Sequence, residues 1–136
     1  MSRLFINKEY SSDCVIDLYE PFKIDNIWKK INLLYFSCAA LSTFQNANSL
    51  QSLQIYISLN TTSLNNNSSI DTQFIIPIED INKCVKFYSN GHFYQNQLMK
   101  KNDINVLERL TIRIYRSDFI PIITNFDFEF LLEFSE

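Results

Sequence analysis

Residues 126–134, with the sequence FDFEFLLEF, alternate in polarity with a period of two. One parity is entirely apolar and the other is mostly acidic: Phe126, Phe128, Phe130, Leu132 and Phe134 against Asp127, Glu129, Leu131 and Glu133. Successive side chains of a β-strand point to opposite faces, whereas a helix would distribute these phenylalanines around its circumference. The segment therefore predicts a strand with one buried face and one charged face.

Three other segments show the same alternation. Residues 108–115 (ERLTIRIY), 53–59 (LQIYISL) and 14–19 (CVIDLY) place apolar side chains at every second position. The residues expected to point inward are Leu110, Ile112 and Ile114, then Leu53, Ile55, Ile57 and Leu59, and finally Cys14, Ile16 and Leu18. We expect each segment to be a strand that buries one face.

Two continuous apolar runs and one turn signal extend the strand pattern. Residues 31–39 and 72–78 fit strands that are buried on both sides or lie near a sheet edge, and Pro77 favours an edge or a strand end. In residues 83–98, Asn90-Gly91 is flanked by β-forming residues, which predicts a hairpin with a type I′ turn. Gly91 is the single glycine of the chain, and it stands where a positive φ is needed.

The remaining segments are predicted to be connections. Residues 61–71 (TTSLNNNSSID) are polar and low in complexity, so we expect an exposed loop there. A shorter loop is expected at residues 43–49, and residues 79–82 (EDIN) are compatible with a helical turn. About eight strands without a linker predict one all-β domain over residues 1–136, a sandwich and not a parallel α/β sheet.

Charge and hydropathy exclude several classes of protein. The net charge is −3, and no run of Lys or Arg is long enough to follow a phosphate backbone, so we expect no nucleic-acid binding. The longest apolar run, residues 31–41, is about half of a membrane span. The N-terminal segment MSRLFINKEY lacks the apolar core of a signal peptide. We therefore expect neither membrane association nor secretion through a signal peptide.

The sequence gives no support for a catalytic or metal site. Cys14, Cys38 and Cys84 are far apart, and His92 is the only histidine, so a zinc site would lack ligands. We expect three reduced and mostly buried thiols. The acids of residues 126–134 would need partners and a pocket to bind calcium or hydrolyse a glycoside, so a solvated or interface face is the preferred interpretation. We expect no enzyme activity, no cofactor and no metal.

Several aromatic side chains are expected to point outward. Tyr56 and Tyr115 face away from the apolar rows of their strands, and Tyr88, Phe93 and Tyr94 flank the predicted hairpin turn. Outward aromatic rings stack on sugars or bases, or fill a subunit interface. Because few basic residues accompany them, the sequence favours the interface over ligand stacking.

The order of these features resembles that of a known family. Residues 73–77 (QFIIP), 93–95 (FYQ), 110–114 (LTIRI) and 125–133 (NFDFEFLLE) resemble strand patterns of the jelly-roll capsid proteins of eukaryotic DNA viruses and Maverick/Polinton-type elements. The resemblance extends from about residue 50 onward and concerns strands, not catalytic residues. The sequence departs from the family pattern at residues 116–121 (RSDFIP). Such proteins often place Asp and Gly there, in the turn before the last strands.

The resemblance implies an eight-stranded antiparallel jelly-roll sandwich with a structural role. The length fits one jelly roll, which implies a penton-like or minor capsid component. The implied partners are copies of the chain and other capsid proteins, and the implied location is the virion, assembled inside the host cell. We expect interface contacts from Tyr56, Arg113, Tyr115, Asp127 and Glu129, which face away from the apolar rows of their strands.

Two other classes stay open. A carbohydrate-binding sandwich would use outward aromatic residues, such as Tyr56 and Tyr115, on a concave sheet. A lectin-like or cytokine-like receptor-binding protein would also be a jelly roll, but it should be secreted, and the sequence shows no secretion signal.

Overall fold

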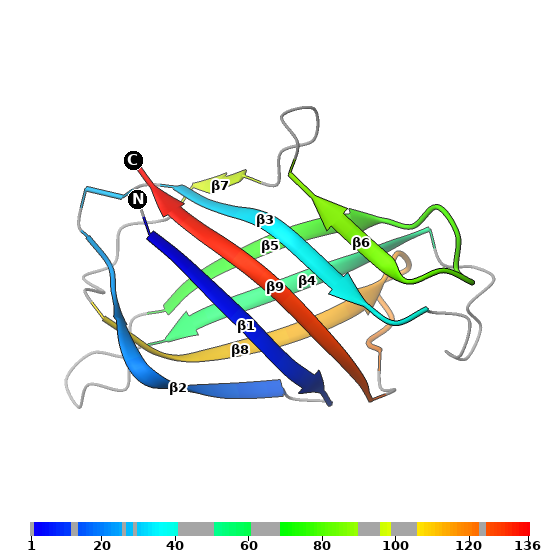
Figure 1. The fold of residues 1–136 in the computed structure, drawn as a ribbon, viewed down its shortest axis with the longest axis horizontal. Coiled ribbons are helices and arrows are strands. Elements are labelled where there is room, and N and C mark those ends of the chain that lie inside the picture. Colours follow the sequence, from blue (N-terminus) through cyan, green and yellow to red (C-terminus); the bar gives the residue numbers. More distant parts are fainter. Residues whose placement is uncertain are drawn as a thin grey trace.

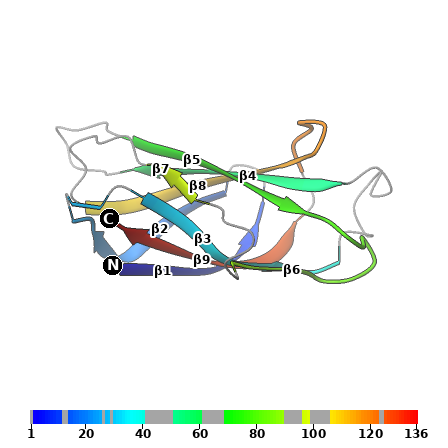
Figure 2. The ribbon, with the colours of Figure 1, turned by 90° about the horizontal axis from the view of Figure 1, so that it is seen from above.

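Two antiparallel β-sheets pack face to face in this protein (Figures 1 and 2). The structure is a computed structural model, and it describes residues 2–11, 14–25, 27–28, 30–40, 51–60, 69–89, 96–98, 106–122 and 125–136. All regular elements within these residues are strands. The all-β class predicted from the alternating segments is therefore confirmed.

The strands divide between two sheets, which we call sheet 1 and sheet 2. Sheet 1 contains β1 (Ser2–Tyr10), β3 (Lys30–Cys38), β6 (Val85–Tyr88), β7 (Asn96–Leu98) and β9 (Phe126–Ser135). Sheet 2 contains β2 (Cys14–Lys23), β4 (Ser52–Asn60), β5 (Ser69–Pro77) and β8 (Val106–Arg116). Pro77 ends the edge strand β5, as predicted, because proline donates no hydrogen bond to a ladder.

The strand order identifies the sandwich as a jelly roll. Sheet 1 has the order β1-β9-β3-β6 and sheet 2 the order β2-β8-β4-β5. Strand β9 pairs with one edge of β3, and β6 and β7 share the other edge. β6 pairs with residues 35–38 of β3, and β7 pairs with residues 30–32. The nine strands therefore fill eight positions. This order is that of two interleaved Greek keys, which defines an eight-stranded jelly roll.

The core lies between the two sheets and contains the side chains that the alternation predicts. Leu110, Ile112 and Ile114 of β8 are 0% exposed, and the apolar parities of β4 and β9 are also buried. Burial of one such side chain stabilises the fold by roughly 1.5–3 kcal/mol. Within β9, the rings of Phe128 and Phe130 stack with their centroids 5.7 Å apart.

The hairpin predicted for residues 83–98 is not formed by the described residues. Its two arms, β6 and β7, pair in line with β3 and not with each other. An isolated two-stranded hairpin is marginally stable, whereas pairing with β3 lets Val85 and Phe87 enter the core. The turn residues Asn90 and Gly91 lie outside the described residues.

Strand β1 is present although the sequence pattern did not predict it. Ile6 and Tyr10 are buried, but Lys8 interrupts their parity with an exposed charge, which weakens the alternation. β1 pairs with β9 over its full length, from Ser2 to Tyr10. The described residues therefore form nine strands, against about eight predicted, and these fill eight positions because β6 and β7 share one edge of β3.

Three predicted connections differ from the structure or lie outside it. Strand β5 begins at Ser69, so the last part of the predicted 61–71 loop is strand, and residues 61–68 are not described. The predicted helical turn is a hydrogen-bonded turn in which Asp80 accepts from Asn82 N and Lys83 N at 2.9 and 3.3 Å. Residues 43–49 also lie outside the described residues.

Candidate functional site

The five residues predicted to form an interface lie on two opposite faces of the sandwich. Tyr56 on β4, with Arg113 and Tyr115 on β8, lies on the outer face of sheet 2, because the alternate positions of both strands are buried. Asp127 and Glu129 of β9 lie on the outer face of sheet 1 for the same reason. The core separates the two groups, so they do not form one site (Figure 2).

The outer face of sheet 1 carries a row of apolar and aromatic side chains that crosses the whole sheet. Phe5 of β1 pairs with Leu131 of β9, Leu131 pairs with Tyr35 of β3, and Tyr35 pairs with Tyr88 of β6. We call these four residues the apolar row. Phe5 and Tyr88, on the two edge strands, are 56% and 58% exposed. The row therefore offers aromatic surface to solvent at both of its ends.

Polar contacts flank the apolar row on both sides. On one side, Arg3 Nε lies 3.2 Å from Glu133 Oε2. On the other, the Tyr35 hydroxyl donates a 2.6 Å hydrogen bond to Glu129 Oε1. This bond raises the pKa of Tyr35 above its ordinary value, because the phenolate could not donate it and would be repelled by the carboxylate. Glu129 thereby fixes the Tyr35 ring, whose centroid lies 5.2 Å from that of Tyr88.

Asp127 lies beyond this contact, directly opposite Glu9 of β1. Two carboxylates that face each other across a strand pair repel, unlike the ion pair at the other end of the sheet. Within the described residues, no group of three His, Cys, Asp or Glu side chains is placed to hold a metal ion. The acids of β9 therefore line a polar outer face and do not converge on one centre.

The outer face of sheet 2 is hollowed by a cavity of about 370 Å³, which we call the sheet 2 cavity. Tyr56 is the register partner of Arg113, and the rings of Tyr56 and Tyr115 meet edge to face with centroids 5.2 Å apart. The other outward residues that line the cavity are Ser58, Asp71, Thr111 and Phe119. The structure thus brings three of the predicted residues together, as a pocket with aromatic, hydroxyl and charged groups.

The guanidinium of Arg113 has no hydrogen-bond or ion-pair partner within the described part of the chain, and the residue is exposed. The contrast with Arg109 on the same strand is direct, since Arg109 Nε lies 2.7 Å from Asp17 Oδ1. A guanidinium presents a planar fork of donors that matches a carboxylate or a phosphate. The sheet 2 cavity therefore contains a cationic group that is available to an external anion.

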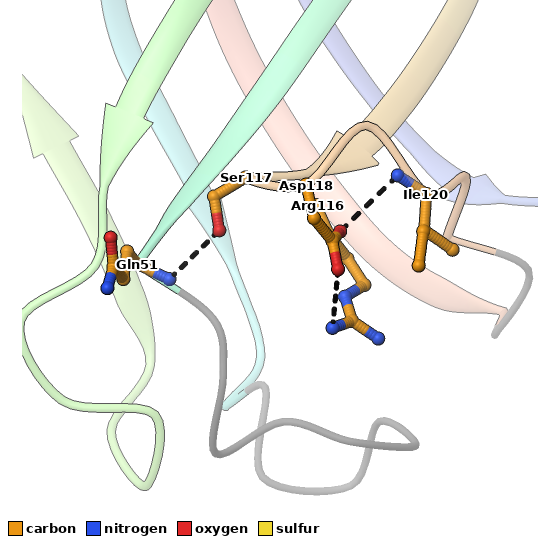
Figure 3. A network of polar contacts seen from close by, with 5 residues as sticks. All are labelled: Gln51, Arg116, Ser117, Asp118 and Ile120. Atoms are coloured by element: carbon orange, nitrogen blue, oxygen red, sulfur yellow. Dashed lines mark hydrogen bonds and ion pairs between the residues drawn. The ribbon is translucent and has the colours of Figure 1, made fainter.

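A braced turn after β8 places Phe119 at the edge of this cavity. Arg116 N donates to Ile120 O and Phe119 N donates to Arg116 O, both at 2.9 Å. The carboxylate of Asp118 accepts from Arg116 Nη2 at 2.9 Å and from Ile120 N at 3.4 Å (Figure 3). Phe119 has a φ of 64° and is 64% exposed. A bulky residue with positive φ is strained, and such strain concentrates at functional sites.

Strand β4 supplies a further support for this turn. The Ser117 hydroxyl accepts a 3.4 Å hydrogen bond from Gln51 N, next to the start of β4 (Figure 3). After the turn, Ile122 N donates to Ile114 O at 3.0 Å, which returns the chain to β8. Contacts on both sides therefore hold the turn in place.

The thiols are free, but only two of them are buried. Cys14 and Cys38 lie in the core, whereas Cys84 precedes β6 and is exposed, which corrects the prediction for this residue. Burial raises the pKa of the Cys38 thiol to about 12, with a smaller contribution from Cys84. Burial also raises the pKa of Cys14. Neither buried thiol faces a base that would activate it as a nucleophile among the described residues.

The comparisons with known proteins add nothing to the interpretation of these two surfaces. Comparison with protein-family models, with curated proteins and with solved structures finds no match for this chain. Within the described ranges, no helix is both long and apolar enough to cross a membrane. His92, Phe93 and Tyr94 lie outside the described residues. The resemblance to capsid proteins stays a prediction.

The sequence pattern did not identify two members of the apolar row. Phe5 lies on β1, whose alternation is weak, and Tyr35 lies in a run that was compatible with burial on both sides. A bulge at Leu34 shifts the register of β3 against β9 between Leu33 and Tyr35, which places Tyr35 on the outer face. A bulge of this kind has no signal in the residue pattern alone.

Proposed function

We propose that this protein is a non-catalytic structural subunit that assembles with copies of itself into a capsid or capsid-like shell. The observation that carries the proposal is the apolar row on the outer face of sheet 1. The jelly-roll strand order supports it, because viral capsid domains are among the proteins that use this fold. Other shell proteins are proposed partners and the virion is the proposed location, whereas neither nucleic acid nor a membrane is among the proposed partners.

The apolar row has the anatomy of an interface. It crosses four strand positions, which corresponds to about 15 Å at the usual spacing between strands. Exposed rings stand at both ends, while the Arg3–Glu133 ion pair lies beside it. Apolar and aromatic groups at the centre of a patch with polar groups around it are typical of protein interfaces.

A second copy of the chain is the occupant that fits this row best. If two copies face each other with their strands aligned and their strand order reversed, Phe5 of one copy lies over Tyr88 of the other. Leu131 then lies over Tyr35, so apolar groups meet apolar groups along the whole row. In the same arrangement Lys86 of β6 lies over Asn7 of β1, beside the acidic end of that strand. The row is therefore self-complementary, as a two-fold contact requires.

Substitution of Tyr88 tests the proposal. We expect Tyr88→Ser to lower the average mass in solution at concentrations at which the wild-type chain is assembled, because the substitution removes one exposed ring at the end of the row. Loss of an aromatic interface residue typically weakens association by about tenfold or more. Light scattering or sedimentation equilibrium measures the effect.

Tyr19→Ser provides the matched control. Tyr19 is 100% exposed on β2, in sheet 2, so the same change there removes an exposed ring outside the apolar row. The control variant should assemble as the wild type does. Equal assembly of all three proteins, or equal loss in both variants, would show that the apolar row is not the contact surface.

A further inference from the structure

We propose that the sheet 2 cavity binds an acidic sugar, that is, a pyranose ring that carries a single carboxylate. The site is distinct from the apolar row, because the two lie on opposite outer faces of the sandwich. It also goes beyond a general carbohydrate-binding role, since it assigns the charge of the ligand and the group that reads this charge. The cavity volume of about 370 Å³ lies within the range of small-ligand sites.

The guanidinium of Arg113, which has no partner among the described residues, is the group that would bind the carboxylate. Arg113 is exposed inside a hollow whose walls are partly aromatic, so a bound anion would be shielded from part of the solvent. The neighbouring Arg109 is neutralised by Asp17, but no described residue neutralises Arg113. A carboxylate can accept two parallel hydrogen bonds from such a fork.

The aromatic groups account for the ring of the ligand. Tyr56 and Tyr115 form an edge-to-face pair in the wall of the cavity, and Phe119 also lines it. Phe119 remains 64% exposed although its backbone has a φ of 64°. The ring is not held by burial in the core, and it is exposed to contact the apolar face of a sugar.

The remaining polar groups distinguish a sugar acid from a phosphate. Ser58 and Thr111, which are register partners on β4 and β8, offer hydroxyls, and Asp71 on β5 offers an acceptor for sugar hydroxyls. The carboxylate of Asp71 would repel the second negative charge of a phosphate dianion. A ligand with one negative charge and several hydroxyl donors therefore fits the cavity best.

A pair of small probes tests this proposal on the full chain. Methyl glucuronide carries the carboxylate, and methyl glucoside is its neutral analogue. We expect nuclear magnetic resonance titration to show binding of the glucuronide at least about tenfold tighter than that of the glucoside. We expect Arg113→Gln to remove this preference. The control is Arg109→Gln, which changes an exposed arginine of the same strand that has its own acidic partner and should keep the preference.

A second variant separates the two parts of the site. Phe119→Ala removes the ring at the rim but no charge, so it should weaken both probes by a similar factor. Equal affinity of the two probes, an absence of saturable shifts with the glucuronide, or a preference that survives in Arg113→Gln would each overturn the proposal. Neither probe reports on the apolar row, so the assembly proposal stands or fails separately.

Discussion

Aspartate side chains organise three of the turns in the described part of the chain. Asp25, Asp80 and Asp118 each accept a hydrogen bond from the backbone N–H two residues later, at 3.2, 2.9 and 3.4 Å. This Asx-turn geometry replaces a backbone hydrogen bond with one to a carboxylate. The chain has a single glycine, so its turns depend on Asx-turns of this kind. At Phe119 a residue other than glycine adopts the left-handed conformation.

The strain at Phe119 leads to a prediction for stability. Glycine adopts positive φ without a steric penalty, whereas alanine does not. Phe119→Gly should therefore have a free energy of unfolding about 1 kcal/mol higher than that of Phe119→Ala. The comparison isolates the backbone, since both variants lose the ring. Chemical denaturation measures it, and a less stable glycine variant would contradict the strain at this position.

The buried thiol of Cys38 leads to a pH dependence. Its pKa is about 12 in the folded chain, against an ordinary value of 9.0. The unfolded chain therefore loses this proton first, so the stabilisation is complete below pH 9 and is lost as the pH rises toward 12. Over this window the free energy of unfolding should fall by up to about 1.4 kcal/mol per pH unit more in the wild type than in Cys38→Val.

Urea denaturation at several pH values measures this difference. Cys84→Ser is the control, because it removes an exposed thiol that contributes less to the Cys38 shift than burial does, so it should change the slope of the wild type far less than Cys38→Val does. If Cys38→Val lost stability with rising pH as steeply as the wild type, the pH dependence would not come from the thiol of Cys38.

At the scale of the element, β9 is the strand on which the whole fold depends. It lies between β1 and β3 in sheet 1 and buries five side chains toward sheet 2: Phe126, Phe128, Phe130, Leu132 and Phe134. Phe130→Ala should lower the free energy of unfolding by about 3–5 kcal/mol, because it leaves a cavity in a packed core. Denaturant titration measures the loss.

The neighbouring residue on the same strand is the matched control. Leu131 lies on the outer face and is only half-buried, so Leu131→Ala should cost less than about 1 kcal/mol in the monomer. Equal losses in the two variants would mean that the strand does not alternate between core and surface.

The sequence predicts the strands of this fold best where one face is apolar and the other is mostly polar. β4, β8 and β9 meet this condition, and their inward residues were identified individually. The pattern is insufficient for β1, where Lys8 breaks the parity, and for β6 and β7, which a glycine-containing segment separates. Local turn preference predicted that these two segments pair together, but the free edge of β3 decided their pairing.

The candidate sites could be predicted only in part, for a geometric reason. The pattern shows that Tyr56, Arg113 and Tyr115 point outward, but not that β4 and β8 are neighbours and place them in one cavity. It likewise cannot show that Phe5, Leu131, Tyr35 and Tyr88 align, because this depends on the strand order and on the bulge in β3. Register across a sheet is set by the fold, not by any single strand.

At the scale of the whole molecule, the jelly roll carries the two proposed binding surfaces on opposite outer faces. Sheet 1 carries the apolar row, and sheet 2 carries a cavity with aromatic walls and with Arg113, whose guanidinium has no partner among the described residues. One continuous core fills the space between the two sheets. A substitution on one outer face should therefore leave the structure of the other outer face unchanged. A two-fold contact through the apolar row would pair two subunits and leave the outer face of sheet 2 accessible to a ligand.

The mass of the wild-type chain in solution, measured by light scattering across a concentration series, tests the central proposal most directly. We predict that the average mass rises from the 16.1 kDa of one chain to a discrete multiple of it as the concentration increases. A mass of 16.1 kDa at every concentration would contradict self-assembly through the apolar row.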